Sequence, residues 1–197
     1  MSLEQDTFIL AEKALQKVVN QITDDQWNLE VPKYMTIGDD PVDLRFLINR
    51  HVYDDAWIGD TLSGKTIAEV GTKYDGDLLG DDPKASFNAA VDKAIMEVEA
   101  LDGEDLDKTV NLTYGDFPVR EYLKHISSYR GFRAYTIANF LGLDDQLDPA
   151  LVQGLWDEVV PQVEQWRAWG VFGPAIEVPE DADQQTKLLG IVGFLQK

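Results

Sequence analysis

The sequence predicts an all-α fold: an antiparallel four-helix bundle with an extra C-terminal helix and a short extended segment, formed by residues 1–197 as a single domain. Three observations predict it. Apolar residues recur at helical spacing in five separate segments. Loops of turn-forming residues join these segments. Only in residues 108–119 do apolar and polar side chains alternate as they do in a strand or hairpin. Successive helices of this kind bury their apolar stripes against one another, as in a bundle.

The first and third helical segments are plain amphipathic patterns. Residues 4–22 place their apolar side chains on one stripe, and residues 83–101 do the same. Residues 59–83 are rich in Gly and Asp and are expected to form a surface loop with a short helix. Their aspartates lack the spacing of a calcium-binding loop, so we interpret them as solvated loop and cap residues.

The second helical segment carries two polar residues on its inner stripe. It begins near Asp43, and Asp40 is the expected cap, with Pro41 in the first turn. His51 and Asp55 are four positions apart and therefore share a face. Burying them costs free energy unless each has a partner. We therefore expect polar partners inside the bundle.

The last two segments carry clear stop signals. The fourth covers residues 118–141 and is expected to end at Gly142. The fifth covers residues 149–169, and Pro161 should kink or divide it. The remaining chain begins extended and ends in a short apolar helix that contains IVGFL.

On the fourth segment, Tyr129 and Arg133 are four residues apart on the stripe predicted to face inward. An arginine in a core needs an anionic partner, because its guanidinium cannot lose its charge. Asp55 is the candidate within the chain, and a bound anion is the other. If the second and fourth helices are neighbours, His51, Asp55, Tyr129 and Arg133 form a core polar cluster or ligand pocket.

Composition excludes several classes of protein. Lys and Arg number 17 against 36 Asp and Glu, a formal charge of -19, so nucleic acid and anionic lipid are repelled. Without cysteine there are no disulfides, thiolate metal ligands or cysteine nucleophile. The N-terminal MSLEQDTF has no features of an export signal, and no apolar run reaches the ~20 residues of a membrane helix. We therefore expect a cytoplasmic protein.

Several segments together carry a resemblance to a known family. They are AEKALQKVVNQITDDQW, LINRHVYDDAWIGDTLSG, TYGDFPVREYLKHI, LGLDDQLDPALV and FGPAIEVPEDADQQTKLLGIVG. In order and spacing they resemble the DinB-like superfamily, and within it actinobacterial proteins related to the metal-binding domain of mycothiol-dependent maleylpyruvate isomerase. The resemblance covers nearly the whole chain. It implies a four-helix up-down-down-up bundle, a divalent metal held by three side chains, often zinc or nickel, and frequent dimers.

The metal ligands of this family match the chain only in part. One is a histidine in the second helix, which His51 matches. The other two are a His or Glu and a His four residues later, and those positions fall on Tyr129 and Arg133. Tyrosine is an uncommon ligand and a guanidinium has no lone pair to offer, whereas a catalytic zinc takes three protein donors and an open position. We therefore predict a degenerate metal site and favour no cofactor.

A shifted metal site is the alternative. Glu121 and His125 have E-x-x-x-H spacing, and with His51 they supply two histidines and one carboxylate. The shift moves the site about 12 Å along the bundle, away from where His51 should lie. On this alternative the protein is a metal- and thiol-dependent transferase or isomerase, in which zinc or nickel presents mycothiol, or another low-molecular-weight thiol, as a thiolate.

The sequence thus leaves three functions open. The first is binding of a small anionic ligand or a protein partner by a DinB-like bundle with a degenerate metal site. The second is the metal- and thiol-dependent enzyme. The third is an interaction protein, such as a homodimer, with the acidic face or the IVGFL segment as interface; IVGFL packs either across subunits or onto its own bundle. No nucleic acid or membrane partner is expected.

Overall fold

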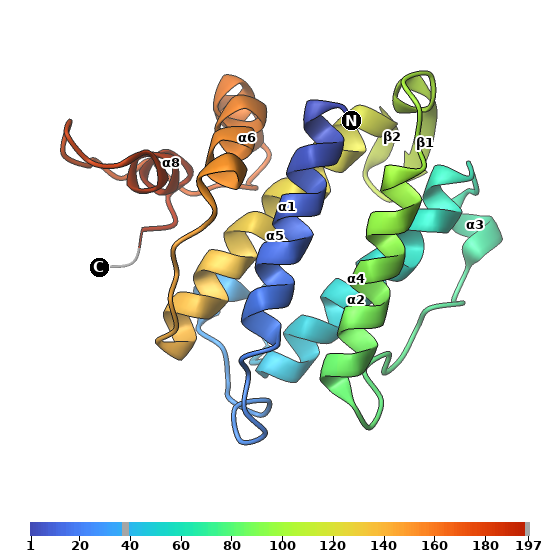
Figure 1. The fold of residues 1–197 in the computed structure, drawn as a ribbon, viewed down its shortest axis with the longest axis horizontal. Coiled ribbons are helices and arrows are strands. Elements are labelled where there is room, and N and C mark those ends of the chain that lie inside the picture. The colour runs from blue at the N-terminus through green and yellow to red at the C-terminus, as the bar shows by residue number, and fades with distance from the viewer. Residues whose placement is uncertain (37–39, 196–197) are drawn as a thin grey trace. The chain divides into compact units, whose positions relative to one another are not determined.

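The chain is described by a computed structural model, which covers residues 1–36 and 40–195. These residues are mostly helical and include one small antiparallel two-stranded sheet (Figure 1), so the predicted helical class is confirmed. No helix in this part of the chain is long and apolar enough to cross a membrane. The helices are α1 (Leu3–Val19), α2 (Leu44–Leu62), α3 (Ile67–Val70), α4 (Pro83–Glu99), α5 (Val119–Leu141), α6 (Pro149–Val159), α7 (Val163–Ala168) and α8 (Gln184–Val192), and the strands are β1 (Thr109–Leu112) and β2 (Gly115–Pro118).

The chain divides into two compact units, which are described separately. Unit 1 contains Met1–Leu15 and Leu123–Lys197, and unit 2 contains Gln16–Tyr122. The long helices α1 and α5 each contribute residues to both units.

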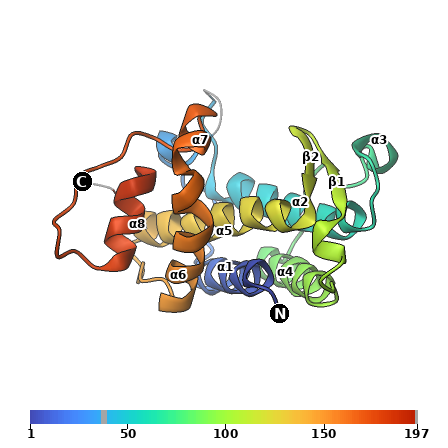
Figure 2. The same cartoon turned by 90° about the horizontal axis from the view of Figure 1, so that it is seen from above.

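Unit 2 is built on the packing of α2 against α4. The β1–β2 hairpin pairs Val110 with Phe117, and β1 contacts α2, as Figure 2 also shows. The C-terminal turns of α1 are joined to α4 by side-chain hydrogen bonds from Gln16 to Asp92 (3.3 Å) and from Asn20 to Asn88 (3.2 Å). Apolar side chains from α2 and α4 fill the space between these elements, including the fully buried Leu44, Ile48, Ile58, Phe87, Val91 and Val98.

Unit 1 has an apolar core formed largely by α5, α6, α7 and α8. Phe132, Phe172 and Phe194 pack edge to face, with ring centroids 5.3 to 5.9 Å apart. Figures 1 and 2 show α8 beside α6, and the two helices are in contact. The IVGFL segment therefore packs within its own chain, where Val192 is fully buried. The members of the core are Ala11, Phe132, Tyr135, Leu151, Val152, Leu155, Val159, Val163, Trp166, Phe172, Leu188, Leu189 and Val192.

The predicted start of the second helix near Asp43 is confirmed, because α2 begins at Leu44, but the predicted cap was wrong. Asp43, not Asp40, caps α2, because its carboxylate accepts the backbone N–H of Phe46 at 2.7 Å. The reason lies in the preceding chain, where Val31 N–H bonds to Val42 and Asp43 forms a bridge with Glu30. This pairing keeps the backbone extended up to Asp43, so the helix begins at Leu44 and Asp43 takes the capping position.

The predicted helix stops in the C-terminal half are confirmed. α5 ends at Leu141, and the next residue, Gly142, has a φ of 67°, a conformation that favours glycine. Pro161 divides the fifth segment into α6, a 3₁₀ turn at Val160–Gln162, and α7. This division follows because proline lacks the N–H that would continue an α-helix.

Candidate functional site

Two oppositely charged side chains are completely buried in unit 1. Arg130 on α5 donates from Nε to Oε1 of Glu12 on α1 at 3.0 Å, and neither side chain has any exposed surface. A guanidinium keeps its charge in any environment, so burial requires a nearby carboxylate. The sequence predicted a buried arginine of this kind but assigned it to Arg133, which is partly exposed.

The prediction that Tyr129 and Arg133 lie on the inner stripe of α5 was wrong, because the buried face of the helix is rotated away from them. Leu123, Ser127, Arg130, Ala134 and Ile137 form a continuous buried stripe, whereas Tyr129 and Arg133 are partly exposed. A signal for the true pair was present in the sequence. Glu12 lies four residues after Phe8 and one after Ala11, on the apolar stripe of the first helix, and a carboxylate there calls for a basic partner.

Tyr129 and Arg133 contact each other along α5. The guanidinium carbon of Arg133 lies 5.3 Å from the centre of the Tyr129 ring, and that of Arg130 lies 5.5 Å from it. Both distances are within the range of a cation–π interaction. The phenol ring therefore has two guanidinium groups against it, and that of Arg130 also pairs with Glu12.

His51 and Asp55 lie on the buried face of α2 in unit 2. Their exposed fractions are 0% and 1%, so the prediction that both face inward is confirmed. Tyr129 and Arg133 belong to unit 1. The association of the four side chains in one cluster therefore stays a prediction.

The alternative metal ligands are distributed over the same two units. His51 and Glu121 belong to unit 2 and His125 to unit 1, where the imidazole packs edge-on against Trp166 with ring centroids 5.4 Å apart. Across residues 1–36 and 40–195, no group of three or more His, Cys, Asp or Glu side chains is placed to hold a metal ion. The zinc or nickel site with mycothiol stays a prediction, to which this geometry adds no support.

Asp60, at the C-terminal end of α2, joins the following loop to the helix. Its carboxylate accepts hydrogen bonds from Lys65 Nζ (2.6 Å), Lys73 Nζ (2.7 Å) and Tyr74 OH (2.8 Å). These donors, Lys65 first, hold the pKa of Asp60 far below its usual range. Sequence reasoning treated the aspartates of this region as solvated or capping residues, and it missed this one because the donors come from an irregular loop.

Comparison with known proteins adds nothing to these observations, since no family model, no curated protein and no solved structure matches the chain. The resemblance to the DinB-like superfamily therefore stays a prediction from the sequence.

Proposed function

We propose that this chain is a DinB-like helical protein whose metal site is degenerate and whose function is to bind a small anionic ligand. The single observation that carries the proposal is the arrangement around Tyr129. At the two positions where the resemblance places metal donors, the chain has a phenol and a guanidinium that stack on each other at 5.3 Å. Such a pair suits anion recognition better than metal ligation, because the guanidinium has no lone pair and a phenol is an uncommon ligand.

Local positive charge supports an anion at this place. Arg130 and Arg133 both lie against the Tyr129 ring, and Arg133 is partly exposed. In a protein of formal charge -19, an anion needs a local cation to overcome the overall repulsion.

The anion proposal is tested by calorimetric titration with inorganic phosphate and with succinate as probes. Arg133→Met should weaken binding by roughly tenfold to a hundredfold, because a charge-assisted hydrogen bond contributes about 1.5–3 kcal/mol. Arg120→Met is the matched control. Arg120 lies on the same helix, and its charge is paired with Asp107 at 2.7 Å on the surface. The proposal would be refuted if Arg133→Met bound both probes with the same affinity as the wild-type protein.

The metal-dependent alternative is tested by elemental analysis of the purified protein. The proposal expects no stoichiometric zinc or nickel, and expects His51→Ala to leave the metal content unchanged. Stoichiometric metal that is lost in His51→Ala, together with mycothiol binding only in the metal-loaded protein, would replace our proposal with the thiol-dependent transferase or isomerase.

A further inference from the structure

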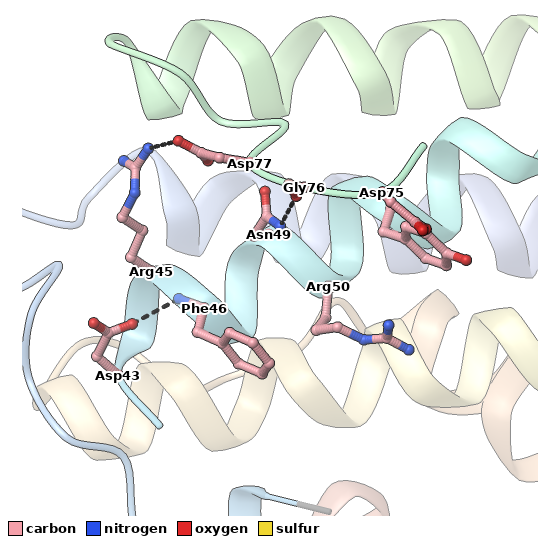
Figure 3. Close-up of a pocket in the computed structure, with 9 residues that line it drawn as sticks. Asp43, Arg45, Phe46, Asn49, Arg50, Asp75, Gly76 and Asp77 are labelled. Atoms are coloured by element: carbon pink, nitrogen blue, oxygen red, sulfur yellow. Dashed lines mark hydrogen bonds and ion pairs between the residues drawn. The ribbon is translucent and has the colours of Figure 1, made fainter. Parts of the chain in front are cut away.

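A pocket of about 630 Å³ lies on unit 2 against the outer face of α2 (Figure 3). This face is opposite to the one that carries the buried Ile48, His51 and Asp55. The volume is within the ~300–1,000 Å³ of pockets that hold small molecules. The lining comprises Asp43, Arg45, Phe46, Asn49, Arg50 and Tyr53 from the start of α2, with Asp75, Gly76 and Asp77 from the loop before α4.

The loop wall of the pocket is fixed to α2 by two side chains one helical turn apart. Asn49 donates from Nδ2 to the carbonyl of Gly76 at 2.9 Å, and its Oδ1 accepts the N–H of Leu78 at 2.7 Å. Arg45 donates to the Asp77 carboxylate and to the carbonyl of Gly80, both at 2.8 Å. Figure 3 shows these contacts bridging from the helix to the loop. The site is therefore formed before a ligand arrives, which lowers the entropy cost of binding.

Two charges of opposite sign in this pocket have no ionic partner within residues 1–36 and 40–195. Asp77 is neutralised by Arg45, and Asp43 caps α2 through the N–H of Phe46. Among the residues that the structure describes, Arg50 has only a cation–π contact, 5.0 Å from the ring of Tyr53, and neither Arg50 nor Asp75 takes part in an ion pair.

Aromatic surface lies beside the guanidinium. Phe46 is 54% exposed, which is unusual for a large apolar side chain. Phe46, Arg50 and Tyr53 are spaced by four and three residues, so they share one face of α2. Figure 3 shows Phe46 and Arg50 projecting from the same side of the helix. A ligand with an apolar ring would cover Phe46.

We propose that this pocket binds a small aromatic zwitterion of the α-amino acid type. The ligand carboxylate pairs with Arg50, its ammonium group pairs with Asp75, and its ring packs against Phe46 and Tyr53. A ligand with only a negative charge would be opposed by Asp75, and one with only a positive charge by Arg50. The pocket is independent of the anion site proposed on α5, so either proposal can fail alone.

Calorimetric titration with three matched probes tests the class of ligand. L-phenylalanine has both charges, 3-phenylpropionate only the carboxylate, and phenethylamine only the ammonium group. We expect L-phenylalanine to bind about tenfold or more tightly than either singly charged probe, because each lost charge pair weakens binding by about that factor. No detectable binding of L-phenylalanine at millimolar concentration, or binding of either singly charged probe as tight as that of L-phenylalanine, would overturn the proposal.

Variants at exposed positions test the assignment of residues. Arg50→Gln and Asp75→Asn should each weaken L-phenylalanine binding about tenfold or more. Lys13→Gln and Glu99→Gln make the same charge changes at exposed sites outside the pocket and should leave affinity unchanged. Circular dichroism confirms that each variant is folded. Wild-type affinity in Arg50→Gln or in Asp75→Asn, or equal losses in the control variants, would contradict the assignment.

Discussion

The buried Glu12–Arg130 pair provides the strongest test of the structure. Replacing Glu12 by Leu leaves the guanidinium of Arg130 in a site with no exposed surface. At a separation of 3.0 Å and an effective dielectric constant of about 20, the lost Coulomb attraction is about 5.5 kcal/mol. Measured losses on breaking such a pair are about 3–5 kcal/mol, which is a large part of the ~5–15 kcal/mol that stabilises a typical domain. We expect Glu12→Leu and Arg130→Met each to lower the free energy of unfolding by about 3–5 kcal/mol.

A double-mutant cycle separates the pair from its surroundings. The double variant Glu12→Leu/Arg130→Met removes both charges together and should lose at least ~2 kcal/mol less than the sum of the single variants. Urea unfolding followed by far-ultraviolet circular dichroism measures all four proteins. The exposed pair of Arg120 and Asp107 is the control, and its removal should cost at most about 1 kcal/mol. Additive losses, or single-variant losses as small as those of the control, would refute the reasoning.

Three further predictions concern packing and charge. Gly154→Ala should lower the free energy of unfolding, measured in urea, by about 1–3 kcal/mol, because the added methyl carbon would collide with Oγ1 of Thr7. The methyl carbon of Gly103→Ala meets nothing within 4 Å, so that substitution should be neutral. Leu188→Ala, at a fully buried position of α8, should lower the free energy of unfolding by about 2–5 kcal/mol, and no loss would show that α8 does not pack on this core. The folded-state pKa of Asp60 is lowered, so its contribution to stability is present above the unfolded-state pKa of about 4 and is lost as the pH falls through the folded-state value. The difference in urea midpoint between wild type and Asp60→Asn should therefore be largest near neutral pH and shrink at acid pH, and a constant difference would argue against the contacts described.

Periodicity predicted the helices well where the apolar stripe was narrow. On α2, the apolar positions around His51 and Asp55 define a single face, and the structure buries that face. On α5, apolar and aromatic residues occur on several sides, including Ile126, Phe132 and Phe140. Several rotations of such a helix bury similar apolar area, so the pattern alone cannot select one. The assignment of the buried arginine to Arg133 instead of Arg130, three positions away, follows from this ambiguity.

The remaining contacts depend on irregular segments. The role of Asp60 as a shared hydrogen-bond acceptor can be recognised only in the folded structure. There the loop brings Lys65, Lys73 and Tyr74 to its carboxylate. The same holds for the pocket on α2, whose second wall is a loop fixed by Arg45. Neither helical nor strand periodicity constrains where such side chains meet, because they come from residues without a repeating backbone geometry.

The polar anchoring of the loop before α4 has a consequence for dynamics. Residues 71–77 bury no side chain completely, and their attachment depends on hydrogen bonds and ion pairs to α2. Opening this segment exposes little apolar surface, so it costs less free energy than unfolding of the helices. Exposed ion pairs are screened by salt, which lowers that cost further. The ligand proposed for the α2 pocket would contact this wall, so its binding and the closure of the loop would be thermodynamically linked. We therefore expect the ligand to slow amide hydrogen exchange in residues 71–77, and we expect high salt to weaken its binding.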